Sequence, residues 1–208
     1  MKKLILSVLL IPAVFSAQQT VSRDAEIANY VSQVSADSLK SHINKLVSFG
    51  TRHTMSSTTD AKKGIGAARN WVLSKFKNYA KNTDGRMEVF LQSQTIQPDG
   101  KRINQPTDLG NAIAILRGTD PNDKRIFMIG GHLDSRVSDV MNAKDFAPGA
   151  NDDGSGVGAV IESARILSQS KFPATIIFVA FSGEEQGLLG AKMLAEKAKN
   201  ENWQLEAL

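Results

Sequence analysis

The sequence predicts an α/β fold: a three-layer α/β/α sandwich with a mixed, mostly parallel central sheet. One observation is the unbroken apolar run Thr175–Phe181, which is rich in β-branched residues and lies between Pro173 and Gly183. Such a run is typical of a strand buried on both faces, as in a sheet covered by helices. The other is the alternation of strand-like and helix-like patterns along the chain, which predicts layers joined by right-handed crossovers.

Four helices are predicted from apolar residues that recur at the spacing of one helical face. The segments with this spacing are residues 38–47, 61–79, 157–167 and 187–199. In the first segment, Leu39, Ile43 and Leu46 share a face, and the pattern ends at Gly50. The second segment carries several lysines on its other side, which is typical of a helix packed on a surface.

Strands are predicted from alternating or unbroken apolar residues over 87–96, 111–116, 125–129 and 175–181. The first alternates, so we expect it to be exposed on one face. The second and third are joined by the turn-rich residues 118–123, which favours a β-hairpin between them. Residues 202–208 show the alternation of a strand that is just beginning, so we expect the fold to be truncated at its C-terminal side.

The N-terminal residues predict export. Lysines precede an apolar run over residues 4–15, and the small residues Ser16 and Ala17 follow it. This order is typical of a secretory signal peptide, here residues 1–17, and the run is shorter than the roughly 20 residues that a membrane span needs. An uncleaved membrane anchor is the alternative. We expect residues 18–208 to be secreted or periplasmic, without stable membrane association after cleavage, and to form the N-terminal part of one domain.

Composition argues against a nucleic-acid partner. The formal net charge of +4 at pH 7 falls to +2 once the two lysines of the signal peptide are removed. The other lysines are scattered over polar helix faces and do not form a basic stripe with aromatic residues. Because the chain has no cysteine, an exported form must be stabilised by its core or by bound metal rather than by disulfides.

Three polar segments occur at the ends of predicted elements: GGHLDS, PGANDDGSG and SGEEQG. Ligands bind at the C-terminal ends of strands in open α/β sheets, so we expect the three segments to meet there. In the first, Asp134 lies two residues after His132 and could orient its imidazole as a metal ligand. A surface histidine after a strand would explain this segment alone equally well.

The acidic pairs also have ordinary structural explanations. Asp152 and Asp153 precede a predicted helix, where one aspartate would serve as an N-cap. Glu184 and Glu185 could form a solvated turn, although adjacent acids at the end of a buried strand repel each other unless a cation or a proton-transfer role compensates. The combination of imidazole and carboxylates at three strand ends favours a metal site, above all for Zn²⁺.

In this order, MIGGHLDS, PGANDDGSG and AFSGEEQGLLG resemble the secreted co-catalytic zinc aminopeptidases. These belong to a superfamily with leucyl aminopeptidases, glutamate carboxypeptidase II, transferrin receptor and glutaminyl cyclase. The segment LVSFGTRHT is also similar to their N-terminal region. The resemblance therefore extends from about residue 37 to the end of the chain, and the series of three motifs is highly specific.

The resemblance implies a role for each polar residue. His132 would bind one zinc, Glu185 would bind the other, and Asp152 would bridge both. Glu184 would be the general base, and Asp134 would hold His132. Two zinc ions about 3.5–4 Å apart would hold a water molecule and polarise the scissile carbonyl. Glu184 would take the proton of this water and pass it to the leaving amine of a peptide substrate.

Two further ligands of that family, an aspartate and a later histidine, are not found in this sequence. The only histidines are His42, His53 and His132, and no suitable aspartate follows Glu185. One zinc would keep His132 and Asp152, and the other Asp152 and Glu185, against about three protein ligands in ordinary catalytic sites. We therefore expect the complete protein to remove N-terminal residues from peptides, and these 208 residues alone to be inactive.

Two other functions stay open. One is a sibling activity in the same superfamily, either a carboxypeptidase of acidic substrates or a glutaminyl cyclase, which uses one zinc and performs an intramolecular transfer. The other is a non-catalytic binding protein that has lost its metal ligands. Retention of His132, Asp152, Glu184 and Glu185 together argues against such a loss in this part of the chain.

Overall fold

The computed structural model describes residues 23–208, so the predicted signal peptide lies outside the described residues. Its five strands form one open sheet in the order β1-β2-β4-β3-β5. They are β1 (Met87–Ile96), β2 (Thr107–Leu116), β3 (Arg125–His132), β4 (Thr175–Phe181) and β5 (Gln204–Ala207). The helices of the described residues are α1 (Ala25–Ser32), α2 (Ala36–Val47), α3 (Gly64–Ala80), α4 (Gly156–Leu167) and α5 (Leu189–Asn200).

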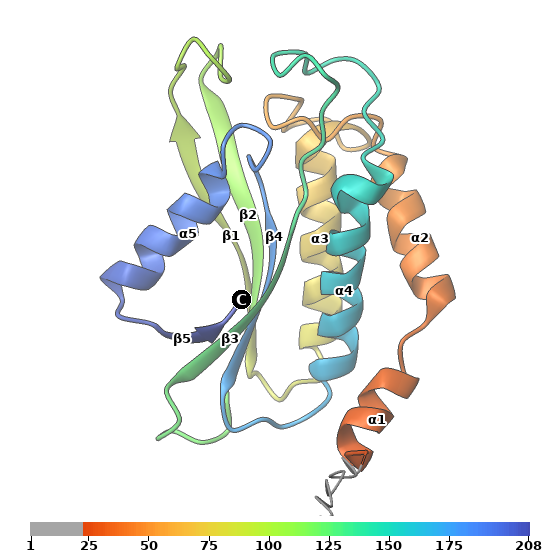
Figure 1. Cartoon of the computed structure of the whole chain (residues 1–208), viewed down its shortest axis with the longest axis vertical. Helices are drawn as coiled ribbons and strands as arrows, with labels where there is room; N and C mark the ends of the chain where they lie inside the picture. The colour runs from red at the N-terminus through yellow and green to blue at the C-terminus, as the bar shows by residue number, and fades with distance from the viewer. Residues whose placement is uncertain (1–22) are drawn as a thin grey trace, which may run out of the picture.

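The sheet lies between two helical layers, as predicted. Helices α3 and α4 cover one face with α2 outside them, and α5 covers the other face (Figure 1). The central strand β4 serves both layers: Ile176 and Phe178 join the core under α3 and α4, whereas Ile177 and Val179 pack with Leu194 of α5. The unbroken apolar sequence of β4 follows from this position, because a strand with two covered faces has no polar side.

The predicted hairpin between β2 and β3 is wrong. Strand β2 pairs antiparallel with β1 and with β4, and β4 lies between β2 and β3. The physical reason is the apolar character of β4, which requires the centre of the sheet and thereby separates the two strands that the turn had suggested as partners. Because β3 pairs parallel with both β4 and β5, every strand except β2 runs in the same direction.

Several element boundaries differ from the predictions. Strand β2 begins at Thr107 rather than at residue 111, since it pairs with β1 over its full length. Strand β3 continues to His132, which is in register with Phe181. Helix α1, which the sequence patterns did not predict, is capped by Asp24. None of the helices in residues 23–208 combines the length and apolar character needed to cross a membrane.

Candidate metal centre

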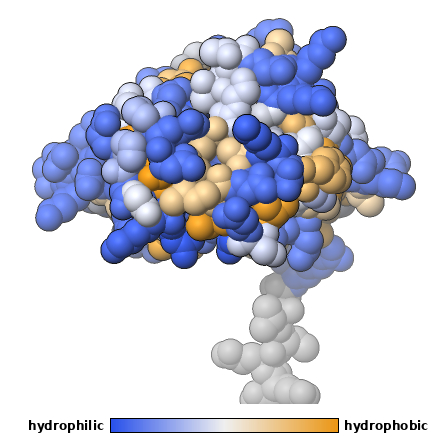
Figure 2. Space-filling view, turned by 90° about the horizontal axis from the view of Figure 1, so that it is seen from above, coloured by the Kyte–Doolittle hydropathy of each residue, from blue (hydrophilic) through white to orange (hydrophobic). Residues whose placement is uncertain are grey.

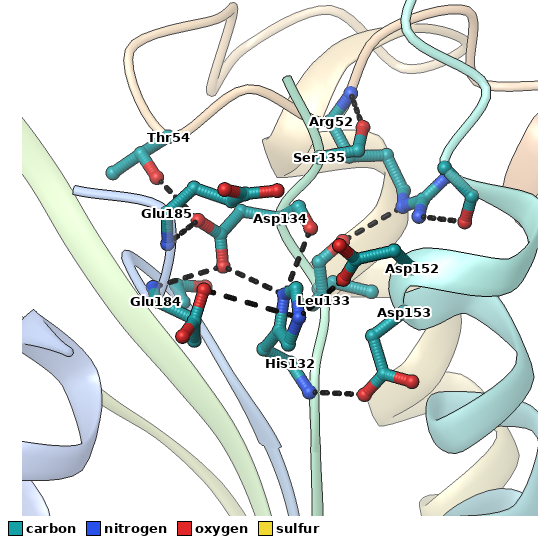
Figure 3. Close-up of polar contacts among 12 residues, drawn as sticks. Arg52, Thr54, His132, Leu133, Asp134, Ser135, Asp152, Asp153, Glu184 and Glu185 are labelled. Carbon is teal, nitrogen blue, oxygen red and sulfur yellow. Dashed lines mark hydrogen bonds and ion pairs between the residues drawn. The ribbon is translucent and has the colours of Figure 1, made fainter. Parts of the chain in front are cut away.

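The candidate centre lies at the end of the sheet where β3 and β4 finish. His132 is the last residue of β3, and Glu184 and Glu185 follow β4 directly. Asp152 lies in an irregular turn, residues 150–155, that leads into α4. Figure 3 shows the side chains of His132, Asp152 and Glu184 turned toward one another. The parallel pairing of β3 and β4 thus brings together residues that are 52 positions apart in the sequence.

The imidazole of His132 is held from one side by Asp134. Its Nδ1 atom lies 3.1 Å from the main-chain oxygen of Asp134, and because a carbonyl only accepts, Nδ1 is the donor. The Nε2 atom then faces Oδ1 of Asp152 at 2.9 Å and Oε2 of Glu184 at 3.9 Å. An imidazole lone pair directed at a carboxylate oxygen is repulsive, so a cation, either a proton or a metal ion, must lie between Nε2 and Asp152.

Without metal, that cation is a proton. Burial lowers the pKa of His132, but the hydrogen bond and charge of Asp134, followed by the charges of Asp153 and Glu184, outweigh burial and raise the pKa to about 9. The imidazole is therefore charged at neutral pH in the metal-free chain. The same negative surroundings that retain this proton favour a metal cation at the same position.

The carboxylate of Asp134 contacts both sides of the centre. It is fully buried, and its Oδ1 lies 3.8 Å from Nδ1 of His132, which the main-chain oxygen of the same residue contacts at 3.1 Å. The two carboxylate oxygens accept hydrogen bonds from the main-chain N–H groups of Glu184 and Glu185, each at 3.1 Å, and Oδ2 lies 3.0 Å from the hydroxyl of Thr54. Asp134 thus fixes the turn that carries both glutamates.

The two adjacent aspartates, Asp152 and Asp153, make different contacts. Asp153 is the structural one: its Oδ1 accepts from the N–H of Gly156 at the start of α4, and its Oδ2 accepts from the N–H of His132, both at 2.9 Å. The side chain of Asp152 is 75% exposed and contacts His132 instead. Asp152 is therefore the member of the pair that is free to bind a metal.

The two glutamates also have different surroundings. Glu185 has a side chain that is 15% exposed, and its Oε2 accepts from Nε of Arg136 at 2.6 Å. The side chain of Glu184 is 40% exposed and points toward His132, and it has no arginine or lysine partner among the described residues. Arg102, from the β1–β2 loop, donates to the main-chain oxygen of Glu185 at 2.8 Å. Glu185 is held in place, whereas Glu184 is accessible.

The residues present fit zinc in kind but provide an incomplete site. Within residues 23–208, no group of three or more His, Cys, Asp or Glu side chains is arranged to hold a metal ion. The physical reason is that Arg136 holds Glu185 and that His132 supplies the single imidazole here. His53 is fully buried with both ring nitrogens near main-chain atoms, and His42 is enclosed between helices. One imidazole and nearby carboxylates are nevertheless donors that zinc prefers.

A pocket of about 290 Å³ adjoins the centre. Its lining includes Gly130, His132, Phe181, Glu184, Leu188 and Ala191. Figure 2, which shows the end of the molecule that lies at the top of Figure 1, displays apolar surface enclosed by hydrophilic groups. Because its lining contains Phe181 and Leu188 as well as His132 and Glu184, the pocket joins an apolar wall to the polar residues of the candidate centre.

Sequence reasoning missed three residues that organise this centre: Arg52, Thr54 and Arg136. Arg52 and Thr54 belong to the segment LVSFGTRHT, to which the resemblance assigned no role. The available signal was a basic residue shortly after the end of an apolar helix pattern. In the structure Arg52 is only 1% exposed, and a buried arginine needs several hydrogen-bond acceptors. No sequence signal pointed to Arg136, whose partner is 49 residues away.

Sequence comparison finds similarity to metalloproteases. Residues 111–207 match the family described as Peptidase family M28. A probable zinc metalloprotease of Pyrenophora teres f. teres is 47% identical over 186 residues, which are 89% of this chain and 40% of that protein. A probable zinc metalloprotease of Leptosphaeria maculans is 44% identical over 89% of this chain and 42% of its own length. The chain thus spans about 40% of the length of these curated relatives.

Solved structures share the fold. The LapA aminopeptidase of Legionella pneumophila superposes with a TM-score of 0.67 and 20% identity, over 99% of this chain and 50% of that one. The glutaminyl cyclase of Porphyromonas gingivalis gives a TM-score of 0.61 and 23% identity, over 83% of this chain and 58% of its own. At these identities the likeness establishes the three-layer architecture, which both catalytic activities use.

Proposed function

Since the chain is related to peptidase family M28 and to probable zinc metalloproteases, we propose that the whole protein is a zinc-dependent aminopeptidase. Its substrates are peptides with a free N-terminus. The proposed zinc ligands are His132, Asp152 and Glu185, and Glu184 is the proposed general base. A complete site with two zinc ions would require ligands in addition to these three.

The observation that carries this proposal is the contrast between Glu184 and Glu185. Both main-chain N–H groups are held by the carboxylate of Asp134, so the two side chains have fixed starting points. The Glu185 carboxylate is largely buried and already pairs with a cation, Arg136. The Glu184 carboxylate is exposed to the pocket and approaches the pair formed by His132 and Asp152. One position suits a cation ligand and the other suits proton transfer.

The chemistry follows from these positions. When bound, zinc polarises the scissile carbonyl and makes water a better nucleophile at neutral pH. Glu184 accepts the proton that the attacking water loses and then donates it to the departing amine. Asp134 prevents the turn with Glu184 from moving during both transfers. His132 stays neutral and in one tautomer, because its Nδ1–H remains bonded to the main-chain oxygen of Asp134.

The adjoining pocket supports a substrate class. Phe181, Leu188 and Ala191 form an apolar wall beside Glu184. A substrate whose reacting carbonyl lies near His132 and Glu184 can place a neighbouring apolar side chain against this wall. The proposed substrates therefore include peptides with an apolar N-terminal residue.

The 208 residues alone are proposed to lack turnover, because each zinc would have two protein ligands from this chain. The test is to measure zinc content and hydrolysis of leucine amide with the 208-residue chain. We expect weak zinc binding and no hydrolysis. Stoichiometric zinc together with normal turnover would disprove this part of the proposal.

The activity itself is tested with the whole protein and two matched peptides, Leu-Gly-Gly and its N-acetylated form. We expect release of free leucine from the first peptide and no cleavage of the second. Glu184→Gln should lower kcat by at least about 100-fold, whereas Glu196→Gln, on the exposed side of α5, should leave kcat unchanged. Cleavage of the N-acetylated peptide at an equal rate would contradict an aminopeptidase.

The same assay separates the alternatives. A glutaminyl cyclase would convert an N-terminal glutamine into a ring with loss of ammonia and would leave every peptide bond intact. A binding protein would retain the peptide without any product. Export is a further proposal, which N-terminal sequencing of the mature protein tests: we expect a start near residue 18.

A further inference from the structure

Arg52 is the most deeply buried arginine near the candidate centre. It lies in the loop between α2 and α3, and 1% of its surface is exposed. Figure 3 shows its guanidinium directed toward the chain segments that carry His132 and Asp152. Among the described residues it forms no ion pair with a carboxylate, because every acceptor of the guanidinium is a main-chain oxygen.

The guanidinium joins three separate segments of the chain. Its Nε donates to the oxygen of Leu133 at 2.7 Å, directly after His132. One terminal nitrogen donates to Pro148 at 2.7 Å and to Leu46 at 3.2 Å, and the other donates to Gly149 at 2.9 Å. Leu46 lies in the last turn of α2, and Pro148 and Gly149 precede the turn that contains Asp152.

Main-chain contacts reinforce this junction. The N–H of Arg52 donates to the hydroxyl of Ser135 at 3.1 Å, and that hydroxyl donates to the oxygen of Ala147 at 2.8 Å. The N–H of Ala147 donates to Gly50 at 2.9 Å. The segment after β3 and the segment before Asp152 are therefore both bound to the loop that contains Arg52.

The position of Arg52 also has an electrostatic consequence. Burial lowers the pKa of its guanidinium to about 10, against the opposing effect of Asp134 and Asp153, so the group is still charged at neutral pH. A buried positive charge next to these aspartates reduces the repulsion among the acidic residues of the centre before any metal binds. Removal of the side chain would leave four carbonyl oxygens without this donor, and those of Leu46 and Leu133 take part in buried hydrogen bonds.

We propose that Arg52 is the positioning residue of the metal centre, which fixes His132 and Asp152 at the separation that one cation requires. Two of its four acceptors precede Asp152 by three and four residues, and a third is the neighbour of His132. A planar fork of donors can hold these carbonyls in one arrangement, which a flexible amine cannot do. This inference rests on the proposed function only for the identity of the cation.

The first test compares zinc affinities by isothermal titration calorimetry of the 208-residue chain. Arg52→Met should weaken zinc binding about 10- to 100-fold, as expected for residues that orient metal ligands. Arg69→Met is the matched control: Arg69 is also buried, pairs with Asp108 at 3.0 Å, and forms no hydrogen bond with the proposed ligands. It should lose stability yet keep zinc affinity within about twofold.

A second variant covers the case in which Arg52→Met does not fold. Arg52→Lys keeps the charge but loses the planar fork, so its zinc affinity should lie between those of the wild type and Arg52→Met. Unchanged affinity in Arg52→Lys would show that only the buried charge is needed, and it would overturn the positioning role.

A metal-free measurement separates this inference from the proposed function. The N–H of Gly154 donates to Gly149 at 2.9 Å, so its hydrogen exchange reports on the turn that contains Asp152. In the zinc-free chain, exchange at Gly154 should be at least about tenfold faster in Arg52→Lys than in the wild type, and unchanged in Arg69→Met. If the 208-residue chain bound zinc too weakly to measure, this exchange would still decide the role of Arg52, while the peptide assay of the whole protein decides the proposed function separately. Equal exchange in all three proteins would reject that role.

Discussion

Nε2 of His132 lies 2.9 Å from Oδ1 of Asp152, although one residue ends a strand and the other precedes a helix 20 positions later. Neither residue could hold this geometry by local structure. Its stability depends on Asp134 behind the imidazole, on Asp153 at the start of α4, and on the Arg52 junction.

Zinc binding should release the proton of His132. The pKa of this imidazole is raised to about 9, so zinc and the proton compete for Nε2 at neutral pH. Below pH 9, zinc affinity should fall about tenfold for each pH unit as far as this single group is concerned. Calorimetric titration at pH 7.5 in two buffers with different ionisation enthalpies should show about one proton released per zinc. Identical heats in both buffers would refute the competition.

The same proton should stabilise the metal-free chain. The folded pKa of His132 lies above its unfolded value of 6.5, so its contribution is complete below pH 6.5 and is lost as the pH rises through about 9. His132→Gln should therefore be less stable than the wild type at pH 6, and this difference should shrink at pH 10. Urea unfolding at both pH values measures it, and a difference that grew with pH would contradict the assignment.

Arg136 should compete with zinc for Glu185. Its Nε atom is 2.6 Å from Oε2 of Glu185, and a metal ion must displace it. Because a partly exposed ion pair contributes up to about 1 kcal/mol, Arg136→Gln should bind zinc about two- to fivefold more tightly. Arg125→Gln, which removes the distant pair with Asp123, is the control and should have no effect. Weaker zinc binding in Arg136→Gln would show that the arginine supports the site.

His42 should make the fold sensitive to acid. Both of its ring nitrogens are buried without a hydrogen-bond partner in the described part of the chain, and burial, followed by the charge of Lys75, lowers its pKa. Its contribution to stability is thus complete above the unfolded value of 6.5 and is lost as the pH falls below it. At pH 7.5 the free energy of unfolding of His42→Leu should equal that of the wild type or be higher by about 1 kcal/mol. At pH 5 it should have fallen less than that of the wild type. An equal acid-induced loss in both proteins, measured by urea unfolding, would reject this role.

Gly149 should be intolerant of any side chain. Its φ of +47° lies in the left-handed region, and an added Cβ would come within 2.5 Å of Cβ of Ser135 and 2.7 Å of the oxygen of Asp152. Gly149→Ala should therefore cost about 3 kcal/mol. Gly85 also has a positive φ, but an added Cβ meets nothing within 4 Å, so Gly85→Ala should cost about 1 kcal/mol. Thermal unfolding of the two variants should separate these costs, and equal losses would exclude a steric cause.

Patterns within single elements were sufficient to predict most of the fold. The apolar run of β4 predicted a covered sheet, because burial on both faces leaves a direct record in the sequence. Strand pairing leaves no such record: the turn-rich residues 118–123 suggested a hairpin, yet they connect β2 to a strand that is not its neighbour, because β4 lies between β2 and β3. Pairing depends on which strand can occupy the centre, and a local turn pattern does not report that.

The candidate centre was predictable to a similar extent. Motif order indicated that His132, Asp152 and Glu184 would meet, and the structure places them together; their roles stay predictions. Which aspartate caps α4 could not be predicted, because Asp152 and Asp153 are identical in type and differ only in backbone direction. Arg52 was missed because its partners are main-chain oxygens, which have no residue type to recognise.

The Arg52 junction sets a lower limit on the piece of chain that can form this centre. The stretch that matches the peptidase family begins at residue 111, whereas the guanidinium that holds both sides of the centre enters from residue 52. A shorter protein that starts at residue 111 would retain every proposed ligand and the base. It would have lost β1, α3 and the one side chain that sets the spacing of those ligands. Boundaries drawn from motif similarity alone would therefore yield a protein with the correct residues and no fixed site.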